Sequence, residues 1–194
     1  MLSLTFAWML ATAAPELDNE YVLVTRGHAV CAVAGTAQCG DRVIVALEDL
    51  DIEAGSGLHR LVRGDIAVFG RAESFTVASG KAFFEVVIKP GHPPAIPPAE
   101  RITPEKNALR HDAADYFVFE EKLEPGDTRP RHSHSQRVVI QLNRTRLQQW
   151  PDGAPEVFVE TIPERPAFSP PVVHKVRNAG DLPLRGIVIE FKPE

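Results

Sequence analysis

Short apolar runs separated by glycines form the hydrophobic pattern of the first half of this chain. The runs are rich in β-branched and aromatic residues, and helical periodicity is hard to find. They predict strands at Tyr21–Thr25, Arg42–Leu47, Asp65–Phe69, Glu73–Val77 and Ala82–Ile88. Short strands with glycine turns between them are typical of an all-β antiparallel sandwich or barrel.

The second half repeats this rhythm after a proline-rich segment. Its predicted strands are Asp115–Leu123, Arg137–Leu142, Thr145–Trp150, Glu156–Ile162 and Leu184–Phe191. Residues 90–107 contain six prolines, a composition typical of an extended, semi-rigid connection. We therefore expect an N-terminal half at 19–89, a proline-rich linker at 90–107 and a C-terminal domain at 108–194.

Composition and charge limit the classes of partner. The chain has 44% hydrophobic and 24% charged residues, as an ordinary globular protein does, and 194 residues suffice for one substantial core or two small ones. Its net charge of −5 argues against a nucleic-acid partner, because proteins that bind nucleic acids usually carry a basic surface.

The first fourteen residues have the features of an export signal. They carry no charge, and the apolar run Leu2–Leu10 precedes the small residues of Ala11–Ala14. The run is too short to span a bilayer as a helix. A basic residue near Met1 is missing, and the alternative is an ordinary N-terminal segment. The pattern predicts a signal peptide at 1–14, a periplasmic or secreted protein, and no stable membrane insertion after processing.

Cys31 and Cys39 are the two cysteines of the chain. In an exported protein they could form a disulfide across a small loop. The alternative is a pair of small apolar thiols, because sequence separation alone does not establish bridging geometry. The sequence leaves both interpretations open.

Three histidines suggest a metal site. His132 and His134 stand at i and i+2 on a predicted strand, so their side chains share a face, and His174 follows on a later strand. Neutral imidazole is a common ligand of transition metals. We predict a divalent metal at His132, His134 and His174, its identity open among Fe, Zn, Ni, Cu and Mn. The alternative is a surface histidine pair in a flexible loop.

The segment around the first two histidines resembles the first signature motif of the cupin superfamily. That motif has a glycine, five residues, His-x-His and then a glutamate. Gly126, His132 and His134 keep the glycine, the spacing and both histidines. The two positions at which the motif has its glutamate hold Val138 and Val139, so the carboxylate ligand is missing.

The second cupin motif ends in His-x-x-x-Asn, and His174 with Asn178 reproduces that ending. The resemblance covers about residues 108–194 and implies a double-stranded β-helix, or jelly-roll-like, barrel with Asn178 as a structural residue. The run Gly64–Phe75 is loosely similar to the second motif, with Phe75 in place of the histidine. Two cupin-like halves are therefore expected, the first without metal ligands.

The missing glutamate affects the expected chemistry. Three neutral nitrogens leave a more positive site with open coordination positions, which suits an anionic substrate. The set resembles the three-histidine iron site of thiol dioxygenases, which are also cupins. Gln136 is the nearest polar replacement, as a fourth ligand or substrate contact, and the alternative is a solvent-facing loop residue. Isomerase and epimerase activities are disfavoured, because the obvious general base is absent.

Arg129, Arg131 and Arg137 make a local basic concentration beside the histidines. At the barrel mouth they would contact the carboxylate or phosphate of a substrate. The alternative is a solvated basic surface, because Arg131 has the opposite strand parity to His132 and should point outward.

Two functions from different classes remain open at this stage. The first is a metal-dependent oxidoreductase or related enzyme that acts on a small anionic substrate. The second is a non-catalytic small-molecule-binding or scaffold cupin that has lost its chemistry. In either case the first half would pack against the second or mediate a homodimer through its sheet edge.

Overall fold

The computed structural model describes residues 14–37, 39–103 and 108–193. These residues form seventeen strands, which pair antiparallel, and contain no helix. The all-β prediction is confirmed. No helix in the described ranges is long and apolar enough to cross a membrane. The predicted signal peptide lies outside the described residues, except for Ala14.

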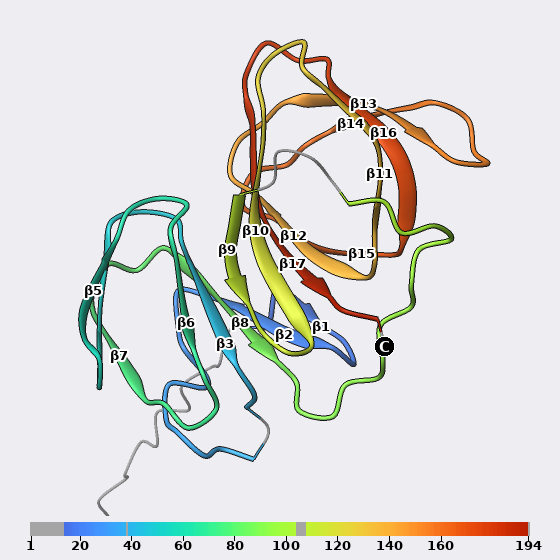
Figure 1. The fold of residues 1–194 in the computed structure, drawn as a ribbon. Coiled ribbons are helices and arrows are strands. Elements are labelled where there is room, and N and C mark those ends of the chain that lie inside the picture. Colours follow the sequence, from blue (N-terminus) through green and yellow to red (C-terminus); the bar gives the residue numbers. More distant parts are fainter. Residues whose placement is uncertain (1–13, 38, 104–107, 194) are drawn as a thin grey trace, which may run out of the picture.

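The N-terminal half is a sandwich of two sheets (Figure 1). The five-stranded sheet has the order β1-β2-β8-β3-β6, and the three-stranded sheet has the order β5-β4-β7. The strands are β1 (Leu17–Asp18), β2 (Val22–Arg26), β3 (Arg42–Ala46), β4 (Leu50–Ala54), β5 (Gly57–Leu61), β6 (Ile66–Phe69), β7 (Phe75–Ser79) and β8 (Phe83–Ile88).

The C-terminal half is a second, larger sandwich, yellow to red in Figure 1. Its five-stranded sheet has the order β15-β12-β17-β10-β9, and its four-stranded sheet has the order β11-β16-β13-β14. The strands are β9 (Ala108–Asp112), β10 (Tyr116–Leu123), β11 (Thr128–His134), β12 (Arg137–Gln141), β13 (Arg146–Pro151), β14 (Val157–Glu160), β15 (Pro166–Ser169), β16 (Val172–Asn178) and β17 (Leu184–Phe191).

The two five-stranded sheets share one hydrophobic core. Val22 and Val86 of the N-terminal sheet belong to the same buried cluster as Val138 and Ile189 of the C-terminal sheet. Because side chains alternate along a strand, the other face of β12 points into the C-terminal barrel. One face of the C-terminal five-stranded sheet therefore packs against the N-terminal half, and its other face forms a wall of the C-terminal barrel.

Apolar side chains fill the interior of the N-terminal half. Ile44, Ile52, Phe69, Phe75 and Phe83 belong to one buried cluster there. Phe75, which occupies the histidine position of the loose motif, stacks on Phe69 with ring centroids 4.5 Å apart. These side chains thus form a packed hydrophobic core between the two N-terminal sheets.

The structure joins Cys31 and Cys39 in a disulfide, with Cα atoms 5.8 Å apart. Both cysteines are buried and pack with Val87 of β8. The backbone N–H groups of Val30 and Cys31 donate to the carboxylate of Glu85, so the bridged loop is anchored on β8. The bridge therefore fastens this loop to the five-stranded sheet.

The described part of the proline-rich segment is held against the C-terminal half. The N–H of Ile102 donates to Ser133 Oγ over 2.7 Å, and the N–H of Ser133 donates to the Ile102 carbonyl over 3.0 Å. Ile96 N–H donates to Gln136 Oε1 over 2.8 Å. The segment forms no strand up to residue 103, but it packs beside β11 and is not a free spacer.

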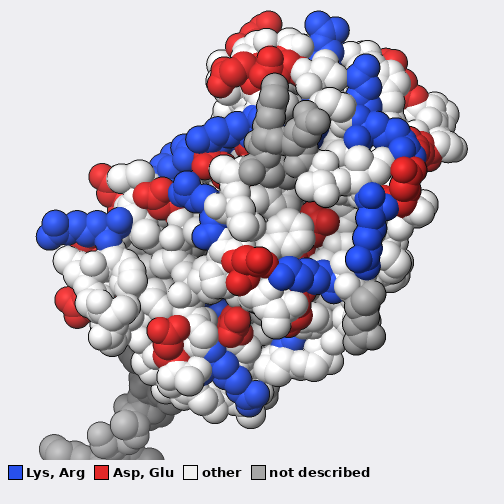
Figure 2. Space-filling view, viewed as in Figure 1, with Lys and Arg blue, Asp and Glu red and all other residues white. Residues whose placement is uncertain are grey.

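Charged side chains of both signs are interspersed on the face of the molecule in Figure 2. Ion pairs also join the halves, because Glu164 accepts from both Arg26 and Arg63. Exposed pairs of this kind contribute little individually, so the shared apolar core holds the halves together.

Candidate metal centre

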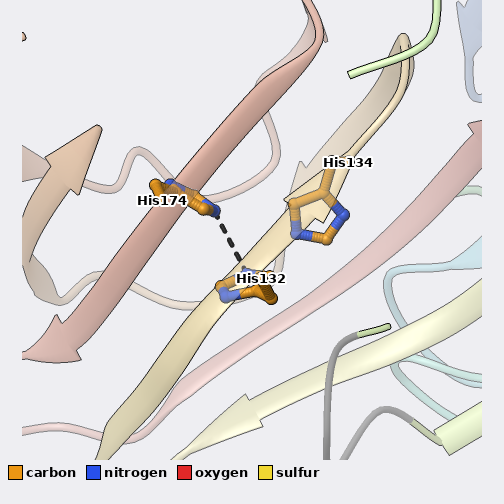
Figure 3. Close-up of side chains that lie close together, drawn as sticks. All are labelled: His132, His134 and His174. Atoms are coloured by element: carbon orange, nitrogen blue, oxygen red, sulfur yellow. Dashed lines mark hydrogen bonds between the residues drawn. The ribbon is translucent and has the colours of Figure 1, made fainter. Parts of the chain in front are cut away.

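Two neighbouring strands bring the three predicted histidines together (Figure 3). His132 and His134 lie on β11, and His174 lies on β16 directly opposite His132. All three are buried, and one ligand atom from each lies within 4.8 Å of the others. The Nε2 atoms of His132 and His174 are 3.1 Å apart.

Each imidazole is oriented by an acceptor at its Nδ1 atom. His132 Nδ1 lies 2.8 Å from the Pro130 carbonyl, and His134 Nδ1 lies 2.7 Å from Glu190 Oε2. His174 Nδ1 lies 3.2 Å from Gln149 Oε1. Because these partners can accept a hydrogen bond, they suit the tautomer with the proton on Nδ1, in which the Nε2 lone pair is available to a metal.

Burial keeps the three rings neutral. It lowers the pKa of His134 to about 3 and that of His174 to about 2, mainly by desolvation of the charged form. Desolvation also lowers the pKa of His132. The neighbouring Arg137 lowers the pKa of both His134 and His174 further. Neutral imidazoles are the form that binds metal.

The donor set fits a transition metal. Without a metal, the Nε2 atoms of His132 and His174 are within hydrogen-bond distance of each other, and the same 3.1 Å separation fits two nitrogens at about 2.1 Å from one ion. Two nitrogens bound to one ion can be at most about 4.2 Å apart. The ligand atoms now lie within 4.8 Å of one another, so a small ring rotation brings all three within that range. The outer acceptors at Nδ1 are those that metal-bound histidines usually have.

A cavity of about 440 Å³ opens beside the histidines, inside the C-terminal barrel. His134 and His174 form part of its wall, together with Arg137 and Glu121. Phe119 stacks on His134 with nearly parallel rings, which fixes the ring orientation. The volume is in the range that holds a small organic molecule.

The three predicted anion contacts have different positions. Arg137 lines the cavity, whereas Arg131 points outward and pairs with Glu100 and Asp152, as its strand parity indicated. Arg129 is buried and pairs with Glu121. The register between β11 and β16 shifts between Arg129 and His132, so a bulge places Arg129 inside the barrel.

Gln136 does not lie at the histidines. Its side-chain oxygen accepts from the Tyr21 hydroxyl over 2.6 Å and from the Ile96 N–H over 2.8 Å. The side chain is therefore engaged by the N-terminal half and the proline-rich segment. This is a correction to the fourth-ligand and solvent-facing interpretations alike, and its cause is the sharp change of direction between β11 and β12.

Sequence reasoning missed several polar residues of the site. Glu190 holds His134, Gln149 holds His174, and Glu121 lines the cavity. The position of Glu190 could have been predicted, because it interrupts the apolar run of β17 and lies on the same strand face as the barrel-facing Val188. Gln149 and Glu121 lie among polar neighbours, and nothing in the sequence distinguished them.

Comparison with solved structures identifies the fold. The cupin 2 conserved barrel domain protein from Leptotrichia buccalis superposes with a TM-score of 0.54 at 11% identity, over 91% of this chain and 86% of that one. Oxalate decarboxylase from Lactobacillus farciminis, in its formate complex, gives 0.55 at 12%, over 81% and 72%. Oxalate decarboxylase from Bacillus subtilis gives 0.55 at 10%, over 89% and 69%.

The chain thus has the cupin fold, in which its two β sandwiches follow one another. No protein-family model and no curated protein sequence matches the chain. The prediction of a cupin fold from the two degenerate motifs is confirmed, and the low identities restrict these comparisons to the fold itself.

Proposed function

We propose that this protein binds one divalent transition metal through Nε2 of His132, His134 and His174 and acts on a small anionic molecule in the adjacent cavity. The convergence of three buried, neutral imidazoles, each with its Nδ1 held from outside, carries the proposal. A metal held by only three protein ligands keeps positions open and supplies Lewis-acid or redox chemistry.

The charge balance of the site favours an anion. Arg129 pairs with Glu121, and Arg137 lies near Glu190, whose pKa burial raises to about 7, so these four groups carry no net negative charge beside three neutral rings. A divalent ion adds two positive charges to this buried region. An anionic ligand reduces that excess at low dielectric.

Arg137 is arranged to bind such a ligand. Its Nη1 donates to the carbonyls of Ser135 and Pro170, over 3.2 and 2.8 Å. Within the described part of the chain, no acceptor bonds to Nε or Nη2, and the residue lines the cavity. Two free guanidinium nitrogens are the geometry that recognises a carboxylate.

A non-catalytic ligand-binding function is the second candidate. The carboxylates near the cavity already have partners: Glu121 pairs with Arg129, Glu160 with Arg146, and Glu190 with His134 and Ser135. Ion pairing makes Glu121 and Glu160 poor general bases, and Glu190, whose pKa burial raises to about 7, is engaged by His134 and Ser135. This favours ligand binding if no activity accompanies the metal.

We also propose that the protein is exported to the periplasm or secreted. The Cys31–Cys39 disulfide supports this location, because disulfides persist in oxidising compartments. The metal stays open among Fe, Zn, Ni, Cu and Mn. The Bacillus subtilis oxalate decarboxylase of the same fold contains Mn(II) centres, which supports keeping manganese among them.

Elemental analysis of untagged protein tests the metal proposal. About one metal per chain is expected in the natural sequence, with loss of the metal in His132→Ala/His134→Ala. A control variant, His28→Ala/His59→Ala, removes two N-terminal histidines and should keep the metal. Equal metal content in all three proteins, or none after incubation with each candidate ion, would overturn the proposal.

Turnover tests separate the two candidates. Metal-loaded protein is incubated with small carboxylates, with and without oxygen, and the products are followed by mass spectrometry. Turnover that disappears in His132→Ala/His134→Ala supports the enzyme. Saturable binding of the same molecules without turnover supports the ligand-binding cupin.

A further inference from the structure

The cavity in the C-terminal barrel has an unusual order of polarity. Its buried end is polar, because His134, His174 and Arg137 lie there, and the two histidines are 4% and 6% exposed. Its open end carries the apolar side chains of Val159 and Ile162, which are 39% and 47% exposed, beside the exposed Glu160 and Arg165. A ligand that fills this cavity must therefore place its polar atoms at the buried end and its apolar atoms near the opening.

The strand order explains this gradient. The four-stranded sheet runs from β11, which carries two of the histidines, through β16 and β13 to the edge strand β14. Along this face the lining changes from His174 to Leu147 and then to Val159, which lies opposite Leu147 on β14. In the other sheet β15 is the edge strand, so the cavity opens between two sheet edges.

The polar groups near the opening are already engaged. Thr161 Oγ1 donates to the Asn143 carbonyl and accepts from the Thr145 N–H, while Glu160 pairs with Arg146. Arg165 is the exception: it lines the cavity and has no ion-pair partner among the described residues. A ligand at this end therefore meets mainly Val159 and Ile162, with one guanidinium beside them.

We propose that the ligand is a monoanion with an apolar body, a description that rests on the proposed function and narrows it. Its charged group lies at the buried end, near the histidines and Arg137. Its apolar body lies against Leu147, Val159 and Ile162 and extends toward the opening. Covering the exposed apolar side chains at the opening removes apolar surface from water, which favours binding.

The test uses cobalt-loaded protein, whose visible absorption reports on anions that enter the site. The probes are acetate, butanoate, hexanoate and hexanedioate. The dissociation constant should fall about fourfold for each methylene that becomes buried. Hexanedioate should bind more weakly than hexanoate, because its second carboxylate would be placed against Val159 and Ile162.

Matched variants locate the effect in the cavity. Val159→Ser and Ile162→Ser should weaken hexanoate binding about threefold or more and leave acetate binding and cobalt content unchanged. Val157→Ser is the control, because Val157 is on the same strand and 42% exposed but does not line the cavity. It should change neither ligand.

Each contrary result has a distinct meaning. Equal affinities for acetate and hexanoate with cobalt bound would overturn the apolar body and leave the metal site standing. Tighter binding of hexanedioate, lost in Arg165→Gln, would overturn the monoanion and assign Arg165 to a second charge. Absence of bound cobalt would overturn the proposed function, and this inference with it.

Discussion

The carboxylate of Glu190 orients His134 through a 2.7 Å hydrogen bond between Oε2 and the ring Nδ1. Glu190 lies on β17 of one sheet and His134 on β11 of the other, so this bond crosses the barrel. Its second oxygen accepts from the N–H and the hydroxyl of Ser135. The glutamate of the cupin motif, which this sequence lacks, would bind the proposed metal directly, whereas Glu190 contacts His134 and Ser135 instead.

Glu190→Gln should lower metal affinity about 10- to 100-fold, because the amide is a weaker partner for the imidazole that must donate to it. Competition with a chromophoric chelator measures the change. Glu85→Gln, a buried glutamate of the N-terminal half, serves as control and should keep the affinity. Unchanged affinity in Glu190→Gln would show that the ring orients itself by packing on Phe119.

The buried pair of Arg129 and Glu121 should matter more for stability than its exposed neighbour. Arg129 is about 1% exposed, so Glu121→Gln leaves a buried charge without its counterion and should cost about 3–5 kcal/mol of unfolding free energy. Chemical denaturation measures this cost. The double variant Arg129→Met/Glu121→Leu should recover part of it.

Arg131→Met is the matched control for the single variant Arg129→Met, which removes the other partner of the buried pair and should be similarly costly. It makes the same substitution two residues along β11, at an exposed pair, and should change the free energy of unfolding by less than about 1 kcal/mol. Equal costs at the two arginines would contradict the inward position of Arg129.

Asn178 should be a stability residue and not a ligand. Its Nδ2 donates to the carbonyls of Leu123 and Leu182, and its Oδ1 accepts from Thr145 Oγ1 and Gly180 N–H. Asn178→Leu leaves these buried groups without hydrogen-bond partners and should lower the unfolding free energy by about 2–4 kcal/mol. Urea denaturation tests it, and a loss below about 1 kcal/mol would be the contrary result.

Glu85 should make stability fall as pH rises. Burial raises the pKa of this carboxyl above its ordinary 4.5, against the lowering effect of the Val30 and Cys31 N–H donors. The folded state then binds the proton more tightly than the unfolded state, so unfolding free energy decreases from about pH 4.5 up to the folded pKa and is level above it.

Comparison with Glu85→Gln isolates this contribution. The difference in unfolding free energy between the natural protein and the variant should decline over that interval, by about 1.4 kcal/mol for each unit by which the pKa is raised. A difference that is constant between pH 4.5 and 8 would show that the carboxyl has an ordinary pKa.

Local pattern was enough to predict most of the strands and the meeting of the three histidines. It failed for the hairpin of β4 and β5, because Asp51 and Glu53 interrupt the apolar positions. In the structure Leu50 and Ile52 are buried between those acids, which is ordinary alternation in a short strand. The acidic residues on the outer face of β4 made its sequence look polar, although its inner face is apolar.

Parity predicted the outward position of Arg131 but could not place Arg129. A bulge on β11 reverses parity between Arg129 and His132, and bulges depend on pairing with a strand far along the chain. The position of Gln136 could not be predicted for a related reason. Its partners Tyr21 and Ile96 lie in other parts of the sequence, and only the packing of the halves brings them to it.

The shared core has a practical consequence for anyone who would study the metal site alone. A fragment that begins near residue 108 would expose Val138, Ile140, Ile187, Ile189 and Phe191, which are fully buried in the intact chain. An uncovered apolar sheet face of this size promotes aggregation. The N-terminal sandwich thus shields the apolar face of its neighbour from solvent, and the two halves must be expressed, mutated and assayed as one piece.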